Sequence, residues 1–92
     1  MKRVHLVISG KVQGVFFRQS SLEFAIASGA DGWVRNRLNG TVELVAQGEP
    51  EKIDRLVTWC HSGPDMASVS SVEVTIVDPI VESEHFHIRP TA

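Results

Sequence analysis

The sequence predicts an α+β domain whose elements run β-α-β-β-α-β and end in a short C-terminal strand over residues 85–89. Strand-like alternation in four segments, helical spacing in two and an Asn-Gly pair between the middle strands predict this class. This order of elements is typical of the split β-α-β arrangement, in which two helices pack on one face of an antiparallel sheet. At 92 residues, the chain has room for one hydrophobic core and therefore for a single domain, residues 1–92.

Four segments alternate as half-buried strands do. The first covers residues 3–9 and the last of the four covers residues 71–77. Residues 33–38 and 41–47 flank Asn39-Gly40, a pair typical of a tight hairpin because both residues tolerate a positive φ. The residues expected on the buried side of these strands are Val4, Leu6, Ile8, Val42, Leu44, Ala46, Val72, Val74 and Ile76.

Two segments have the i, i+3, i+4, i+7 spacing of amphipathic helices. The first follows a glycine-containing loop over residues 10–16, and Gly29 or Gly32 is expected to end it in a left-handed conformation. The second opens at residues 49–51, where a proline and two acidic residues suit a first turn, and Gly63-Pro64 closes it. The apolar positions are Leu22, Ala25, Ile26 and Gly29 in the first helix and Ile53, Leu56, Val57 and Cys60 in the second.

Composition and charge narrow the possible functions. A formal net charge of −2 argues against a broad surface for nucleic acid, so any bound anion must be held locally. No apolar run approaches the ~20 residues of a membrane span, and no export signal leads the chain, so we expect a cytoplasmic protein without a membrane partner. Cys60 is the only cysteine, which excludes an internal disulfide and a thiolate metal cluster. Nothing in the sequence indicates an oligomer, and a monomer is expected.

The segment from Ser9 to Arg18 has residues suited to binding a phosphate group. It joins a strand to a helix, where unpaired backbone N–H groups and the helix dipole favour an anion. Gly10 and Gly14 would let those N–H groups converge, and Arg18 would add a planar fork of donors. A nucleotide P-loop is excluded because Val15 follows Gly14, and no third glycine completes a dinucleotide motif. By spacing alone, a simple turn with a solvated Arg18 is also compatible with the segment.

The segment GKVQGVFFR, followed by GWVRN and NGTVE, makes the chain similar to the acylphosphatase family. The resemblance extends from Val4 to the terminal Phe86-x-Ile88. It implies a ferredoxin-like α/β sandwich that hydrolyses small-molecule acyl phosphates without a metal or cofactor. It also implies that Arg18 is the essential phosphate-binding arginine and that Asn36 positions the attacking water. The phosphate cradle implied by the resemblance consists of Val12, Gln13, Gly14, Val15, Phe16, Phe17 and Arg18.

Such a reaction requires few protein groups. The leaving carboxylate has a conjugate acid with a pKa near ~4, so no general acid is needed, and a phosphate oxygen could accept the water proton. Without the resemblance, Asn36 would be a strand residue whose amide satisfies a neighbouring loop. The chain departs from the family pattern at Asn39, where aspartate is usual, and at residues 66–69, which lack the usual arginine.

The histidines, the cysteine and the aromatic residues could indicate other functions. His85 and His87 share a strand face, but no third metal ligand is evident near them. Cys60 beside His61 is not a nucleophile–base pair, because helical neighbours point about 100° apart. The aromatic residues are expected to pack in the core and the loop, since residues 41–47 lack the basic and aromatic run of RNA-recognition domains. The alternative that stays open is an anion-sensing or regulatory module with little turnover.

Overall fold

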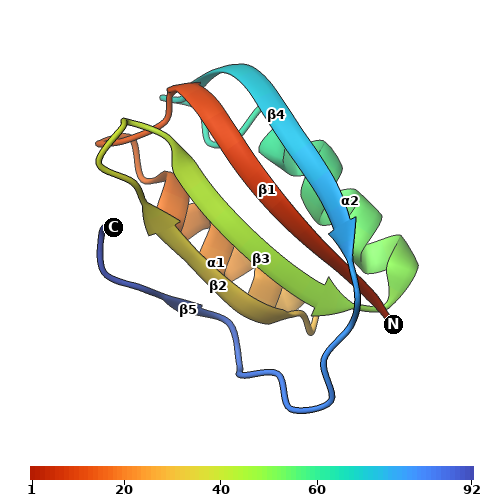
Figure 1. The fold of residues 1–92 in the computed structure, drawn as a ribbon. Coiled ribbons are helices and arrows are strands. Elements are labelled where there is room, and N and C mark those ends of the chain that lie inside the picture. Colours follow the sequence, from red (N-terminus) through yellow and green to blue (C-terminus); the bar gives the residue numbers. More distant parts are fainter.

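The computed structural model describes residues 1–92 and contains a five-stranded sheet with both helices on one of its faces (Figure 1). The strand order is β4-β1-β3-β2-β5. This arrangement confirms the predicted α+β class and the ferredoxin-like fold. The elements are β1 (Lys2–Lys11), α1 (Phe17–Ala27), β2 (Asp31–Asn36), β3 (Val42–Gly48), α2 (Pro50–Cys60), β4 (Ser68–Val77) and β5 (His87–Ile88).

The core lies between the helices and the central strands. On β1 the side chains of Val4, Leu6 and Ile8 are buried, and every second residue of β3 from Val42 to Ala46 faces the same side. On α2, the predicted apolar positions are buried or half-buried, and Pro50 occupies the first turn as expected. Full burial of an aliphatic side chain of this size contributes about 1.5–3 kcal/mol to folding, so these rows fix how the helices lie on the sheet.

The buried face of α1 differs from the predicted one. The helix begins at Phe17, which is fully buried, and successive steps of four residues place Ser21 and Ala25 on the same side. The Ser21 hydroxyl donates to the Phe17 carbonyl at 2.7 Å, so its polar group is satisfied inside the core. Ile26, expected to be buried, is 60% exposed. The position of Phe17 therefore sets the rotation of the helix, and the apolar spacing of its second half does not.

The strand β2 starts and ends two residues earlier than predicted. Gly29 ends α1 with a φ of 68°, as expected, but Gly32 lies inside β2 and pairs with Ala46. The following hairpin is longer than a tight two-residue turn: Arg37 N–H donates to the Thr41 carbonyl at 2.9 Å. Gly40 alone has a positive φ there, and the strand pairing stops at Asn36 because residues 37–41 form the loop.

The edge strand β4 is less buried than its sequence predicts. Its register with β1 places Val72, Val74 and Ile76 on the helix-covered side of the sheet. Val74 is nevertheless 41% exposed and Ile76 is 70% exposed, which contradicts the predicted burial. The physical reason is that β4 is the edge strand and α2 packs mainly on β1 and β3, so the core reaches Val69 and Val72 of β4 but leaves most of its second half exposed.

The C-terminal strand corrects the prediction of an antiparallel sheet. β5 contains only two residues and pairs in parallel with β2. After β4, the chain crosses one end of the sheet and turns back along β2 (Figure 1), so it must run in the same direction as that strand. Gln47 anchors this crossing: its NH₂ group donates to the Ile80 carbonyl and its Oε1 accepts the Ile80 N–H, each at 2.9 Å. Neither helix has the length and apolar content needed to cross a bilayer.

Candidate active site

The loop after β1, the first turn of α1 and the last residue of β2 meet at one end of the sheet. β1 and β2 both run antiparallel to β3, so they run parallel to each other, and their C-terminal ends lie at the same end of the sheet. The loop after β1 leads directly into α1, which packs on β2. The loop, the first turn of α1 and Asn36, the last residue of β2, therefore share this end (Figure 1).

The loop is shorter than predicted, because β1 continues to Lys11. Gly10 belongs to the strand, at an irregularity in the pairing of β1 with β4, and its φ is 119°. A Cβ atom at Gly10 would lie 2.3 Å from the carbonyl oxygen of Ser68, so only glycine lets the two strands approach there. The role that the sequence suggested for Gly10 in curling the loop is therefore wrong, and the loop consists of residues 12–16.

The loop presents its main chain outward. The side chains of Val12 and Val15 are buried in the core, while Gly14 and Phe16 adopt left-handed conformations with φ of 75° and 66°. A non-glycine residue in that conformation costs about 1–2 kcal/mol, and such residues gather at functional sites. The N–H groups of residues 13–16 donate to no protein acceptor, and no side chain caps α1. Unpaired N–H groups at the start of a helix favour an anion.

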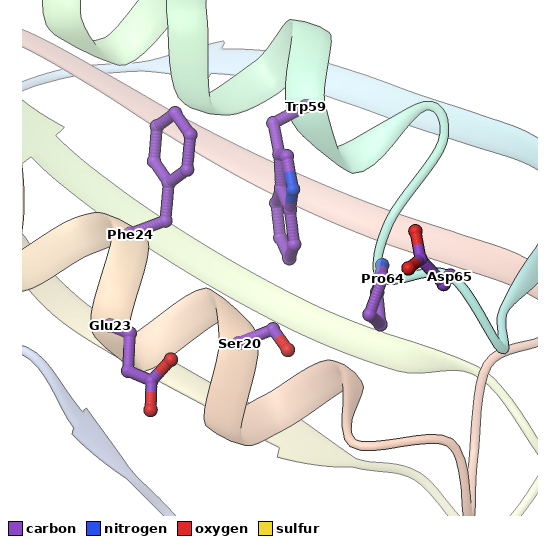
Figure 2. A pocket seen from close by; sticks show the side chains of 6 residues that line it. All are labelled: Ser20, Glu23, Phe24, Trp59, Pro64 and Asp65. Carbon is purple, nitrogen blue, oxygen red and sulfur yellow. The ribbon is translucent and has the colours of Figure 1, made fainter.

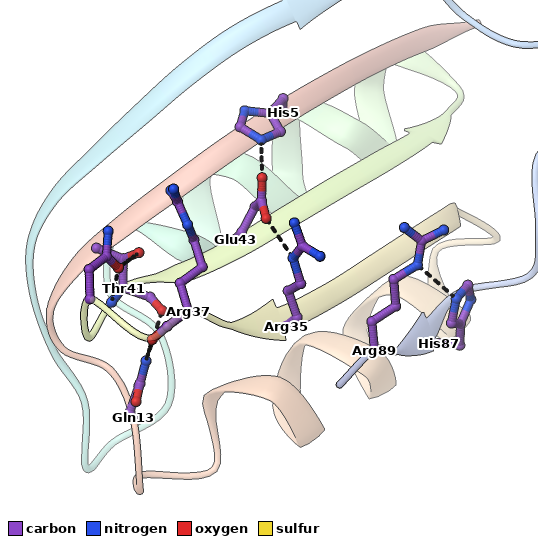
Figure 3. Close-up of polar contacts among 9 residues, drawn as sticks. His5, Gln13, Arg35, Arg37, Thr41, Glu43, His87 and Arg89 are labelled. Carbon is purple, nitrogen blue, oxygen red and sulfur yellow. Dashed lines mark hydrogen bonds and ion pairs between the residues drawn. The ribbon is translucent and has the colours of Figure 1, made fainter. Parts of the chain in front are cut away.

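The side chain of Gln13 ties this loop to the β2–β3 hairpin (Figure 3). Its NH₂ group donates to the carbonyl of Arg37 at 2.8 Å and to the carbonyl of Thr41 at 2.9 Å. Both hydrogens of the amide are engaged in these bonds, so the side chain has no donor left for another group. Only the main-chain N–H of Gln13 is free for an anion.

Arg18 and Asn36 are both half-buried at this end of the sheet. Arg18 is the second residue of α1, and its guanidinium takes part in none of the ion pairs of the structure. Asn36 lies on the helix-covered face of β2, the same face as the buried Val34. The Oδ1 atom of Asn36 is buried and has no hydrogen-bond partner. An unpaired buried acceptor costs about 1–3 kcal/mol, and the Asn36 oxygen satisfies no group of a neighbouring loop.

The charged residues of the opposite face of the sheet form a separate cluster. Glu43 contacts His5 and Arg35, with each N–O distance 2.7 Å (Figure 3). Burial raises the pKa of Glu43, but hydrogen bonds and charge from His5 and Arg35 outweigh it and hold the pKa below its ordinary value of 4.5. Glu43 therefore stays ionised, and the sheet separates it from the Asn36 side chain.

The surface hollows lie away from the loop. A groove of about 490 Å³ separates α1 from α2 and is drawn in Figure 2. Trp59 stacks on Phe24 there, with ring centroids 5.5 Å apart. The residues lining the groove are Ser20, Glu23, Phe24, Trp59, Pro64 and Asp65.

Trp33 is an exception to the predicted core packing of aromatic residues. Its ring lies against the guanidinium groups of Arg35 and Arg89, whose Cζ atoms are 4.9 and 4.5 Å from the ring centroid.

Cys60 and the pair His85 and His87 lie in surroundings that indicate no catalytic or metal site. Cys60 is fully buried, and burial raises the pKa of its thiol to about 12, so it is a core residue and not a nucleophile. The His85 side chain is fully exposed, and the Nδ1–H of His87 donates to the His85 carbonyl at 2.9 Å. No three metal-ligating side chains gather anywhere in the chain.

Comparison with known proteins decides the family. The family model described as acylphosphatase matches residues 4–88. The chain belongs to the acylphosphatase family. An acylphosphatase from Pelotomaculum thermopropionicum is 49% identical over 86 residues, which cover 94% of each chain. These matches confirm the family and the enzyme class predicted from the sequence.

Solved acylphosphatase structures share the whole fold. The crystal structure of an acylphosphatase from Bacillus subtilis is similar with a TM-score of 0.92 and 29% identity, covering 97% of this chain and 99% of that one. The acylphosphatase structure from Coxiella burnetii gives a TM-score of 0.89 and 41% identity, covering 96% of this chain and 92% of that one. The similarity covers nearly the whole chain, so it includes the end of the sheet where the loop and Asn36 lie.

The two departures from the acylphosphatase pattern lie in the β2–β3 hairpin and at the start of β4. Asn39 Oδ1 accepts hydrogen bonds from the N–H and the hydroxyl of Thr41 at 3.1 and 2.6 Å, so asparagine stabilises the hairpin that the acylphosphatase motif places there. Met66 and Ala67 precede β4, and Ser68 and Val69 are its first two residues; Met66 is exposed. The bonds of the Gln13 side chain were not foreseen; only its place inside the acylphosphatase motif indicated a role.

Proposed function

We propose that this protein hydrolyses the carboxyl–phosphate bond of acyl phosphates, giving a carboxylate and inorganic phosphate without a metal or cofactor. One observation supports the proposal most directly. Unpaired loop N–H donors share one end of the sheet with the buried, unpaired Oδ1 of Asn36, in a chain of the acylphosphatase family. The donors match the oxygens of a phosphoryl group, and the acceptor matches a water molecule.

The first part of the proposed mechanism is charge neutralisation. Main-chain N–H groups of the loop and of the first turn of α1 would bind the phosphoryl oxygens, and the helix dipole adds to their attraction. The Arg18 guanidinium would supply two further parallel hydrogen bonds. The residues proposed to form this cradle are Val12, Gln13, Gly14, Val15, Phe16, Phe17 and Arg18.

The second part is the placement of water. The Asn36 Oδ1 would accept a hydrogen bond from a water molecule and direct its oxygen at phosphorus, opposite the carboxylate. As the new P–O bond forms, the bond to the acyl oxygen breaks and its electron pair leaves with the carboxylate. A non-bridging phosphate oxygen takes the water proton. No protein base is required, which agrees with the position of Glu43 on the other face of the sheet.

The proposal is tested with benzoyl phosphate in the presence of EDTA, following its loss by absorbance. We expect Arg18→Ala and Asn36→Ala each to lower kcat/KM by about 10²–10³, the usual effect of removing one preorganised group. Circular dichroism should show that both variants stay folded. Arg55→Ala, at an exposed position of α2, is the matched control and should keep full activity. Unchanged turnover by either folded site variant would contradict its assigned role.

The runner-up is an anion-binding module with little turnover, which the unpaired loop N–H groups would also serve. The same assay separates the two, because phosphate binding by a wild-type protein that does not hydrolyse benzoyl phosphate would support the module.

We further propose that the protein acts as a monomer in the cytoplasm without nucleic acid. The single cysteine, which leaves no internal disulfide, supports the cytoplasm, and the net charge of −2 supports the absence of nucleic acid.

A further inference from the structure

We propose that Gln13 is a positioning residue that fixes the phosphate loop relative to Asn36. This inference rests on the proposed function, and it assigns to the Gln13 side chain a role distinct from binding phosphate. The residue belongs to both parts of the site: its main-chain N–H lies in the anion-binding loop, and its side chain bonds the hairpin that follows Asn36.

The two carbonyls that Gln13 contacts flank the residue pair that contains Asn36. Asn36 pairs with Val42 at the end of the β2–β3 ladder. Arg37 directly follows Asn36, and Thr41 directly precedes Val42. The Thr41 carbonyl also accepts the Arg37 N–H at 2.9 Å, so the Gln13 amide joins the hairpin where its two arms leave the sheet. Figure 3 shows Gln13 extending from the loop to this point.

The chemistry of the contact leaves one orientation for the amide. Carbonyl oxygens only accept hydrogen bonds, so the NH₂ group must face Arg37 and Thr41. Its Oε1 is an acceptor and would repel phosphate oxygens. The Gln13 side chain therefore acts through the main chain, by holding the shape of the loop and its distance from the end of β2.

This link has no duplicate among the loop side chains. Val12 and Val15 attach the loop to the core by apolar packing, and Gln13 makes the only side-chain hydrogen bonds of residues 12–16. A displacement of about 1 Å between reacting groups can lower a rate by about 10²-fold. Loss of the Gln13 amide should therefore separate the bound phosphoryl group from the water that Asn36 orients.

The test compares two glutamines that make similar bonds in different places. Gln13→Met keeps the length of the side chain and removes its donors without adding a charge. Gln47→Met is the matched control, because Gln47 also bonds main-chain groups of a distant residue, Ile80, away from the site. Each variant should lower Tm by about 5–15 °C, since Gln13→Met loses two hydrogen bonds and Gln47→Met loses three, the third being donated by Arg3. Activity is measured well below both Tm values.

We expect kcat for benzoyl phosphate to fall about 10–100-fold in Gln13→Met and less than about twofold in Gln47→Met. The dissociation constant of inorganic phosphate, measured by calorimetry, should change less than about fivefold in both, because the loop N–H groups remain. Gln13→Asn, one methylene shorter, should lose less activity than Gln13→Met. If Gln13→Met does not fold, Gln13→Asn is compared with Gln47→Met instead.

Three results would overturn the assignment. Equal activities of Gln13→Met and Gln47→Met would mean that Gln13 contributes stability alone. A loss confined to KM and phosphate affinity, with kcat unchanged, would make Gln13 a binding residue. A wild-type protein that binds phosphate but does not turn over benzoyl phosphate would remove the proposed function first, a failure distinct from the other two.

Discussion

The role of each polar side chain at the site depends on the face of β2 from which it projects. Asn36 follows Val34 onto the helix-covered face, where its Oδ1 is enclosed and unpaired. Arg35, one residue earlier, lies on the open face and pairs with Glu43. Alternation along a strand thus separates an uncharged acceptor from an ion cluster only one residue away. A water bound at Asn36, as proposed, would be separated from the Glu43 carboxylate by the sheet.

The Glu43 cluster leads to a prediction about stability and pH. Because the pKa of Glu43 is lowered from 4.5 in the fold, the carboxylate stabilises the protein above its unfolded pKa. That stabilisation is lost as the pH falls through the lower folded value. Glu43→Gln should therefore be less stable than wild type by about 1–2 kcal/mol at pH 7, and the gap should narrow below about pH 4.5. Urea unfolding of both proteins at several pH values measures this difference in unfolding free energy.

The control for this experiment is Glu73→Gln, which removes a carboxylate from an exposed position of β4. It should change stability by less than about 0.5 kcal/mol at pH 7. A gap between wild type and Glu43→Gln that stayed constant down to pH 3 would show that the carboxylate charge is not what His5 and Arg35 stabilise.

Sequence reasoning could find Arg18 and Asn36 because both stand inside short motifs at a known spacing. It could not find the contacts of Gln13, whose partners are 24 and 28 residues away in the chain. Those contacts depend on β1 and β2 ending at the same end of the sheet, which is a property of the sheet order. Local pattern shows which residue types are present, and tertiary topology decides which of them meet.

At the scale of elements, periodicity identified which residues share a face but not whether that face is covered. β1 and β4 have the same alternation, yet β1 is central and β4 is the edge strand. The side chains of β1 that face the helices are fully buried, whereas on β4 Val69 and Val72 pack against the core and Val74 and Ile76 are exposed. The strand ends were also misplaced at β2 and β5, because pairing with neighbours rather than propensity determines where a ladder stops.

This difference between central and edge strands can be measured with one type of substitution. Ile8→Ala removes a fully buried side chain and should cost about 2–5 kcal/mol of unfolding free energy. Ile76→Ala, on the same side of the sheet but 70% exposed, should cost less than about 1 kcal/mol. Guanidinium unfolding of both variants gives the comparison. Similar losses at the two positions would indicate that the edge of the sheet is covered.

The whole molecule has one core, and the site is attached to it. Val12 and Val15 of the loop belong to the same buried cluster as Cys60 of α2. Anchoring of the loop and integrity of the core are therefore coupled, and an anion that binds the folded loop should stabilise the entire domain. Cys60 is suited to report this coupling, since it is the only cysteine and is fully buried.

We predict that a thiol reagent such as iodoacetamide modifies Cys60 only when the domain unfolds. The buried side chain and a thiol pKa of about 12 both suppress reaction in the folded state. Phosphate at about ten times its dissociation constant should then slow labelling about tenfold, because it binds only the folded form. Sulfate-free buffer of equal ionic strength is the control. A labelling rate that phosphate does not change would show that Cys60 becomes accessible through a local opening in which the loop between β1 and α1 stays folded.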